Sequence, residues 1–149
     1  MIKRMDLSGD WAFALDADKT GIEQGIFRSL PTDTITLPGT TSIAKKGTPS
    51  DKKEIGFLTD PYLFEGYAWY AKEITLDKDS KNKNIYLHLE RTRLTRVWVN
   101  DVEVGCRDSL TTPHHYDLTP YIKYGQENVI AVRIDNDWNY KERATGTKY

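Results

Sequence analysis

Three runs of alternating apolar and polar residues constrain the fold of this 149-residue chain more than any other feature. They span residues 85–89, 95–99 and 128–135. A period of two places one side of each run on an apolar core and the other side toward solvent, as half-buried β-strands require. Because the runs follow one another closely, they predict a β-meander.

Asn100 and Asp101 separate two apolar-rich triplets, each of which predicts a strand. Asn and Asp tolerate positive φ, so this pair predicts a tight turn that reverses the chain in step with the strand twist. In such a hairpin Val97 and Val99 share one face of the sheet, and Trp98 lies on the opposite face.

The remaining sequence predicts further short strands at residues 11–15, 34–37 and 67–76. Residues 16–30 predict a loop with at most one short helical turn, and residues 40–60 predict a long loop. Many short strands separated by Gly, Pro and Asn favour an all-β sandwich over a helical or α/β fold.

Length and charge narrow the classes of function. A chain of 149 residues can bury one sizeable core, which predicts a single domain over residues 1–149. Charged residues make up 29% of the chain, the formal net charge is -1, and acids and bases are mixed. This pattern argues against nucleic acid and anionic membranes as partners. No apolar run approaches the roughly 18 residues that a transmembrane helix needs.

The sequence predicts no metal site and no cofactor. Cys106 is the single cysteine, which excludes an intramolecular disulfide and a multi-cysteine metal site. His88 falls on the predicted outer face of its strand. His114 and His115 are adjacent, and adjacent strand residues point to opposite faces, so the two can share one ion only at a bend.

Five motifs occur in an order that resembles a known family. They are Phe-Glu-Gly-Tyr-Ala-Trp-Tyr-Ala-Lys-Glu-Ile at 64–74, Leu-Glu-Arg at 89–91, Val-Trp-Val-Asn-Asp at 97–101, Tyr-Asp-Leu-Thr at 116–119, and Asn-Val-Ile-Ala-Val-Arg-Ile-Asp-Asn at 128–136. This order resembles the N-terminal sugar-binding domain of glycoside hydrolase family 2, which includes β-galactosidases, β-glucuronidases and β-mannosidases. The resemblance implies a jelly-roll sandwich of the galactose-binding-domain-like type.

The resemblance also implies a role. Glycoside hydrolysis usually needs two flanking carboxyl groups, and in the family these belong to a separate barrel domain that nothing in this chain resembles. We therefore expect this chain alone to be non-catalytic, nominate no catalytic residue, and expect the parent protein to be a periplasmic or secreted glycoside hydrolase. The domain would brace the catalytic barrel and the other parent domains, and lend polar side chains to a carbohydrate pocket.

The segment after the last predicted strand carries the candidate substrate-binding residues. Asn136, Asp137 and Trp138 offer an amide, a carboxylate and an aromatic ring, which suit sugar hydroxyl groups and the apolar face of a pyranose. The resemblance implies that an Asp at this point reaches the substrate pocket, and Asp137 is the closest match. The alternative is a polar turn in which Trp138 packs as a plug.

Two further features bear on specificity. Trp11, Trp69 and Trp98 lie within strand patterns, so core packing is favoured for them over sugar stacking. The family's galactosidases often carry an Asn-Pro pair where this chain has Tyr-Leu-Phe-Glu-Gly at 62–66, so the resemblance does not extend to galactose specificity.

Three alternatives stay open from the sequence. The domain is an accessory part of a larger enzyme, an autonomous carbohydrate-binding module, or a purely structural interaction domain, because one fold serves all three. The family's closing strands are not found before Tyr149, so we expect a C-terminally truncated fragment whose exposed edge can pair with another copy.

Overall fold

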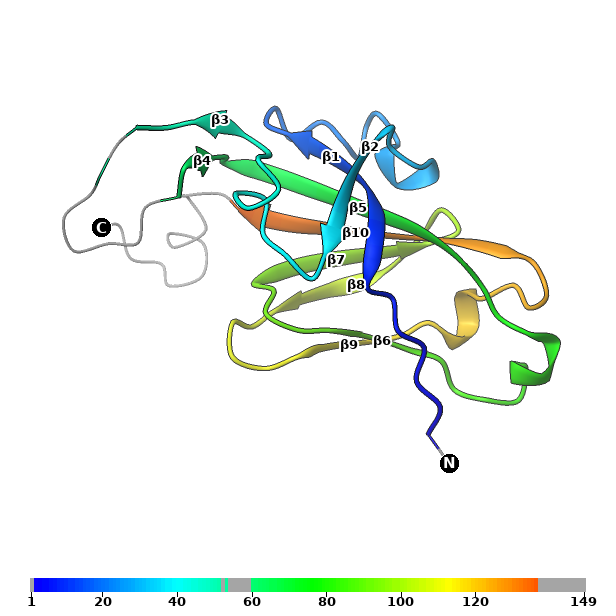
Figure 1. Cartoon of the computed structure of the whole chain (residues 1–149). Coiled ribbons are helices and arrows are strands. Elements are labelled where there is room, and N and C mark those ends of the chain that lie inside the picture. Colours follow the sequence, from blue (N-terminus) through cyan, green and yellow to red (C-terminus); the bar gives the residue numbers. More distant parts are fainter. Residues whose placement is uncertain (1, 52, 54–59, 137–149) are drawn as a thin grey trace.

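The alternating runs form antiparallel strands in the computed structural model, which describes residues 2–51, 53 and 60–136 (Figure 1). The strands are β1 (Gly9–Asp16), β2 (Asp33–Leu37), β3 (Thr48–Pro49), β4 (Tyr62–Leu63), β5 (Gly66–Thr75), β6 (Tyr86–Leu89), β7 (Leu94–Val99), β8 (Val102–Asp108), β9 (His114–Asp117) and β10 (Glu127–Asn136). Three short 3-10 turns join them: η1 (Ile26–Arg28), η2 (Lys78–Ser80) and η3 (Thr119–Tyr121). None of these turns is long and apolar enough to cross a membrane.

Six strands form one sheet in the order β2-β1-β5-β10-β7-β8, and every neighbouring pair is antiparallel. The pair β6–β9 lies across one face of this sheet as a second layer (Figure 1). Strand β10 is central and pairs along its whole length with β5, from Glu127 opposite Thr75 to Asn136 opposite Gly66. The predicted all-β sandwich is therefore confirmed.

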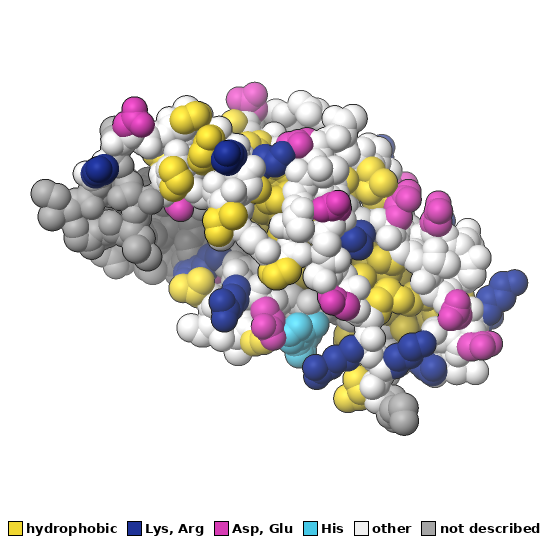
Figure 2. All heavy atoms as spheres, viewed as in Figure 1, with side chains coloured by type: hydrophobic (Ala, Val, Ile, Leu, Met, Phe, Trp, Pro, Cys, Tyr) yellow, Lys and Arg dark blue, Asp and Glu magenta, His cyan; other side chains and the backbone are white. Residues whose placement is uncertain are grey.

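The main core fills the space between the two layers. Its members alternate along the strands, as the period of two predicts. The buried apolar side chains of this core are Trp11, Phe13, Ile35, Ala68, Leu87, Val97, Val99, Tyr116, Leu118, Ile122, Ile130 and Val132. On the surface, acidic and basic side chains are interspersed over the face that Figure 2 shows, in agreement with the mixed charge of the sequence.

A second core lies on the outer face of the six-stranded sheet. Trp98 stacks on Phe27 of η1, with ring centroids 5.4 Å apart, and its centroid is 5.0 Å from that of Trp69. The loop of residues 17–32, which carries η1, covers this face. The predicted burial of Trp69 and Trp98, and of Trp11 on the inner face, is confirmed.

Asp16 fastens the covering loop to the sheet. Its carboxylate accepts hydrogen bonds from the backbone N–H groups of Thr20 and Gly21, each at 2.9 Å. It also accepts one from Nε1 of Trp69 at 3.1 Å. One buried carboxylate thus ties the end of β1, the loop and β5 together.

The β7–β8 hairpin turns at Asn100 and Asp101, as predicted. Both residues have positive φ, at 47° and 72°, which a two-residue turn of this hand requires. The Asn100 side chain adds a long-range tie, because Nδ2 donates to Oδ1 of Asn128 at 2.7 Å and Oδ1 accepts from the N–H of Val129 at 3.1 Å. The turn is therefore bonded to the start of β10.

The segment predicted as a long loop contains a short ladder. Thr48 and Pro49 of β3 pair with Leu63 and Tyr62 of β4. A two-residue strand that includes a proline carries little periodicity, which explains why the sequence pattern did not predict it.

Candidate functional site

Asn136 is the last residue of β10 and lies at the end of the central strand. Its side chain is exposed, and Nδ2 donates to the backbone oxygen of Phe64 at 2.7 Å. The other two predicted residues, Asp137 and Trp138, lie outside the described residues.

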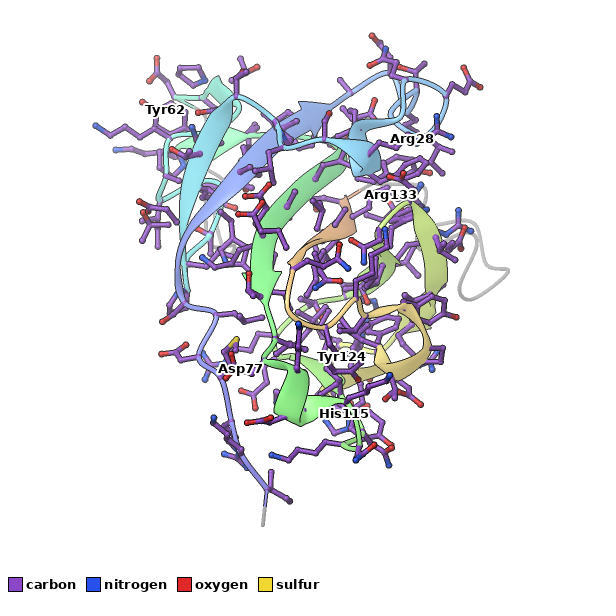
Figure 3. The ribbon with its side chains drawn as sticks, turned by 90° about the vertical axis from the view of Figure 1, so that its right-hand side faces the viewer. Arg28, Tyr62, Asp77, His115, Tyr124 and Arg133 are labelled. Carbon is purple, nitrogen blue, oxygen red and sulfur yellow. The ribbon has the colours of Figure 1, made fainter. Side chains whose placement is uncertain are left out.

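Four more polar or aromatic side chains surround this end of the sheet, and with Asn136 they form what we call the β10-end cluster. Its other members are Tyr67, Arg96, Arg133 and Asp135. Strand register brings them together, because Arg133 lies opposite Arg96 of β7 and Asp135 lies opposite Tyr67 of β5. Figure 3 shows Arg133 at the upper end of the sheet, far from His115 at the lower end.

Arg133 is the most constrained member of the β10-end cluster. It is 8% exposed, and its guanidinium carbon lies 3.8 Å from the centroid of the Tyr67 ring. Burial lowers the pKa of Arg133 from its ordinary value, and the nearby Tyr67 and Asp135 act in the opposite direction. The guanidinium stays charged at neutral pH, so the site holds a fixed cation on an aromatic face.

Acidic side chains offset the two neighbouring cations. Nε of Arg96 lies 3.2 Å from Oε1 of Glu103 on β8, and Asp135 is 5% exposed on the same face as Arg133. Arg133, Asp135, Arg96 and Tyr67 therefore combine donors, acceptors and an aromatic ring on one face of the sheet, whereas the exposed amide of Asn136, the next residue along β10, lies on the opposite face. This chemistry suits recognition of hydroxyl or carboxyl groups and does not supply a nucleophile with an adjacent base.

Gly66 allows the strands to approach closely beside the cluster. Its φ is 136°, and a Cβ atom there would lie 2.9 Å from the backbone oxygen of Asp16. Side chains rarely adopt that φ, and the contact is with backbone that cannot move aside. Any larger residue at this position would push β5 away from β1.

Sequence reasoning missed Arg133 and Tyr67. The signal was an arginine preceded by four apolar residues and followed by one, in Val-Ile-Ala-Val-Arg-Ile at 129–134. Such a buried charge needs a partner, and an aromatic or acidic residue on a neighbouring strand could have been sought. The identity of that neighbour depends on a register that the sequence does not give.

A general acid of glycoside hydrolysis requires a carboxyl group with a raised pKa. The carboxyl groups with clearly shifted pKa values have lowered ones, and in each case a hydrogen bond to the charged form is the main cause. These groups are Asp6, Asp33, Glu90 and Asp117. Raised pKa values occur at Tyr70 and Tyr116, through burial.

An open cavity of about 480 Å³ lies elsewhere, between β1 and residues 24–33. Its lining includes Phe13, Gln24 and Asp33 and none of the predicted sugar-binding residues. The aromatic ring in its lining, Phe13, is 1% exposed, so this cavity presents no ring on which a pyranose could stack.

Comparison with known proteins places most of the chain within one family. The family model for the sugar binding domain of glycosyl hydrolases family 2 matches residues 4–145. The β-galactosidase BoGH2A of Bacteroides ovatus is 30% identical over 139 residues, which cover 90% of this chain and 15% of that protein. A β-glucuronidase of Formosa agariphila is 39% identical over 75 residues, covering 50% of this chain and 8% of that protein.

Solved structures agree on the fold. The β-glucuronidase of Ruminococcus gnavus superposes with a TM-score of 0.71 at 24% identity, over 87% of this chain and 21% of that one. The likeness confirms the predicted jelly-roll sandwich. The chain spans between 8% and 21% of the length of these three relatives.

Proposed function

Because this chain belongs to the sugar-binding domain family of family 2 glycosyl hydrolases, we propose that it is the non-catalytic N-terminal accessory domain of a larger glycoside hydrolase. In this role it braces the catalytic barrel and the other domains of the parent protein. It also lends polar side chains to the edge of the barrel's substrate pocket.

One observation carries the proposal. The family match covers residues 4–145, yet the chain corresponds to a small part of relatives that are named as glycosidases. Asp6, Asp33, Glu90 and Asp117 have lowered pKa values, which do not suit a general acid. Both facts support a division of labour in which the reaction takes place on another domain.

The β10-end cluster is where we place the contact with sugar. Strand β10 is held on both sides by β5 and β7, so its end is a rigid platform for the residues that follow. The exposed Asn136 amide is held by its bond to the backbone oxygen of Phe64. Asp137 and Trp138 follow directly, and we propose that they complete the set with a carboxylate and a ring.

The names of the relatives bear on the substrate. They include a β-glucuronidase and a β-galactosidase, so we propose a β-linked glycoside as the substrate of the parent enzyme. The Asn-Pro pair of the family's galactosidases is absent at residues 62–66, so galactose is not assigned as the sugar. We place the parent protein in the periplasm or outside the cell.

The first test uses the 149-residue chain without an affinity tag. Incubation with aryl β-galactoside, β-glucuronide and β-mannoside should release no aglycone. Calorimetric titration with the matching monosaccharides and β-linked oligosaccharides should give no saturable binding tighter than about 1 mM, which corresponds to roughly 4 kcal/mol. Hydrolysis by the purified chain would overturn the proposal.

The same titration separates the autonomous carbohydrate-binding module from the accessory domain. A free module should bind at least one of these sugars tightly enough to saturate. Trp138→Ala should then abolish binding, whereas Trp138→Phe should keep part of it because a ring remains. That combination of results would replace the accessory role.

The alternative of a purely structural domain that does not contact sugar is tested in the parent enzyme. Asn136→Ala and Asp137→Ala should each raise KM by about tenfold or more if these side chains contact substrate, because one lost hydrogen bond to a bound group is worth about 1–2 kcal/mol. Glu127→Ala, at the opposite end of β10, should leave the kinetics unchanged. Unchanged KM in all three variants would favour a purely structural domain.

A further inference from the structure

Two histidines meet on the outer face of the β6–β9 pair, at the end of the molecule opposite the β10-end cluster. His88 of β6 lies directly across from His115 of β9. Nδ1 of His88 is 2.6 Å from Nε2 of His115, and the ring centroids are 4.7 Å apart. Both rings are exposed, and Figure 2 shows histidine atoms at the surface between acidic and basic side chains.

Glu90 fixes the protonation pattern of this pair. Its Oε1 lies 2.9 Å from Nε2 of His88, and a carboxylate can only accept a hydrogen bond. Nε2 of His88 therefore carries a hydrogen, so when the ring is neutral its Nδ1 presents a lone pair to His115.

We infer that His88 and His115 form a surface site for a divalent transition-metal ion, with Glu90 as its positioning residue. A carboxylate bonded to the remote nitrogen of a histidine is the usual outer support of a metal-binding imidazole, because it fixes the ring and raises its basicity. Here that support exists on His88, and a second imidazole nitrogen lies next to the lone pair it exposes.

Binding needs only small rearrangements. The two nitrogens must separate from 2.6 Å until each is about 2.0–2.1 Å from a shared ion, which exposed side chains on strands can achieve by rotation. The hydrogen on Nε2 of His115 moves to its Nδ1, so two neutral rings bind the ion with no net release of protons. Water molecules complete the coordination.

Charged side chains near the histidine pair affect how favourably a cation binds there. Arg91 and Arg4 lie close enough to act on Glu90, and both oppose a bound cation. Glu90 itself and Asp117, which lies opposite Tyr86 on the same ladder, favour one. Because the site is exposed, solvent and salt screen the effects of these charges on a bound ion. The affinity therefore depends mainly on the bonds between the ion and the two imidazole nitrogens.

His114 is not part of the site. It is 2% exposed, its Nδ1 lies 2.6 Å from Oγ1 of Thr95, and its Nε2 lies 2.9 Å from the backbone oxygen of Ser109. The described residues contain no cluster of three metal-ligating side chains. The site therefore has two protein ligands, and imidazole ligands select Cu²⁺, Ni²⁺ or Zn²⁺ over Mg²⁺ and Ca²⁺.

The test is calorimetric titration of the tag-free chain with CuCl₂, NiCl₂, ZnCl₂ and MgCl₂ near neutral pH, in a buffer that does not chelate metals. We expect one saturable site for the three transition metals, tightest for Cu²⁺, and none for Mg²⁺. His88→Ala and His115→Ala should each weaken binding at least tenfold. Glu90→Gln should weaken it by about tenfold, the usual effect of removing an outer-shell partner.

Glu73→Gln, which removes an exposed carboxylate from the larger sheet, is the matched control and should leave binding unchanged. Circular dichroism checks that each variant is folded, which the exposure of the three side chains favours. Absence of a saturable site below about 1 mM, or affinity unchanged by His115→Ala, would overturn the metal site. Affinity unchanged by Glu90→Gln would overturn the positioning role. None of these outcomes depends on the proposed role in a glycosidase.

Discussion

At the scale of single residues, four polar groups around His114 are connected by hydrogen bonds. Thr95 and His114 are almost fully buried, and the carbonyl of Ser109 can only accept, so Nε2 of His114 carries the hydrogen. Nδ1 then accepts from the Thr95 hydroxyl, and the Tyr116 hydroxyl donates to the backbone oxygen of Thr95 at 3.0 Å. These contacts join His114, Thr95, Tyr116 and Ser109 into one buried network.

Ionisation of Tyr70 should lower the stability of the folded protein at high pH. Burial raises the pKa of Tyr70 from 10.0 to about 12, so between these values the folded state keeps a proton that the unfolded chain has lost. The contribution is complete below pH 10, and the free energy of unfolding should fall as pH rises from 10 to 12. The loss attributable to Tyr70 is at most about 3 kcal/mol.

Urea unfolding at a series of alkaline pH values, compared with Tyr70→Phe, measures this term. Lysine titration affects both proteins equally, so the difference between them isolates Tyr70. If the free energies of unfolding of the two proteins changed with pH in parallel, ionisation of the Tyr70 hydroxyl would not destabilise the folded state.

The environment of a residue could be predicted when the residues that determine it are close by in the sequence. The burial of Trp11, Trp69 and Trp98 follows from strand patterns within a few residues, and it was predicted correctly. The contact of His88 with His115 joins residues 27 positions apart, and depends on how β6 and β9 align. No pattern within either strand contains that alignment, so the pair was not predicted.

At the scale of elements, the β7–β8 hairpin was the most predictable part. Asn100 and Asp101 specify the turn by their own tolerance of positive φ, and the flanking valines specify the faces. The loop of residues 17–32 was predicted as a loop, but its role as a cover for the outer face was not. That role depends on Phe27 reaching Trp98, which is distant in sequence.

Asp16 should control whether this loop stays on the sheet. Asp16→Ala removes the acceptor of three hydrogen bonds and leaves the N–H of Gly21 and Nε1 of Trp69 buried without a partner. We expect a loss of about 2–4 kcal/mol in the free energy of unfolding, measured by urea titration. Asp18→Ala, an exposed neighbour in the same loop, should cost less than about 0.5 kcal/mol. Equal losses in the two variants would contradict the anchoring role.

At the scale of the whole molecule, the period of the apolar residues predicted the sandwich, and the family resemblance predicted the jelly roll. The strand order β2-β1-β5-β10-β7-β8 was not predictable from the pattern. Placing β10 between β5 and β7 requires long-range pairing that many sequences with the same alternation would satisfy differently. For the same reason the β10-end cluster, assembled from three strands, emerged only with the structure.

The sheet edges bear on self-association. In the described part of the chain β2 and β8 are the two edges of the larger sheet. Charged side chains on β8, at Glu103, Arg107 and Asp108, are typical of edges that resist pairing. We expect a monomer at micromolar concentration in sedimentation velocity, with reductant present because Cys106 is exposed.

The outcome that would contradict a monomer is a dimer formed through an exposed strand edge, which the sequence analysis considered. A dimer that Val102→Lys on β8 dissociates, and that Ile43→Lys away from the edges leaves intact, would establish pairing through β8. Both side chains are exposed, so neither variant should unfold the monomer.

The stacked rings on the outer face also give the protein an optical signature. Two indoles whose centroids are 5.0 Å apart and whose planes are inclined by 37° couple their electronic transitions, which produces a paired positive and negative band in circular dichroism. The band depends on the mutual orientation of Trp69 and Trp98, which Phe27 and the Asp16 bond help to hold. Partial detachment of the loop would therefore change the spectrum while the backbone signal of the sheet persisted, so local opening and global unfolding can be followed separately without a label.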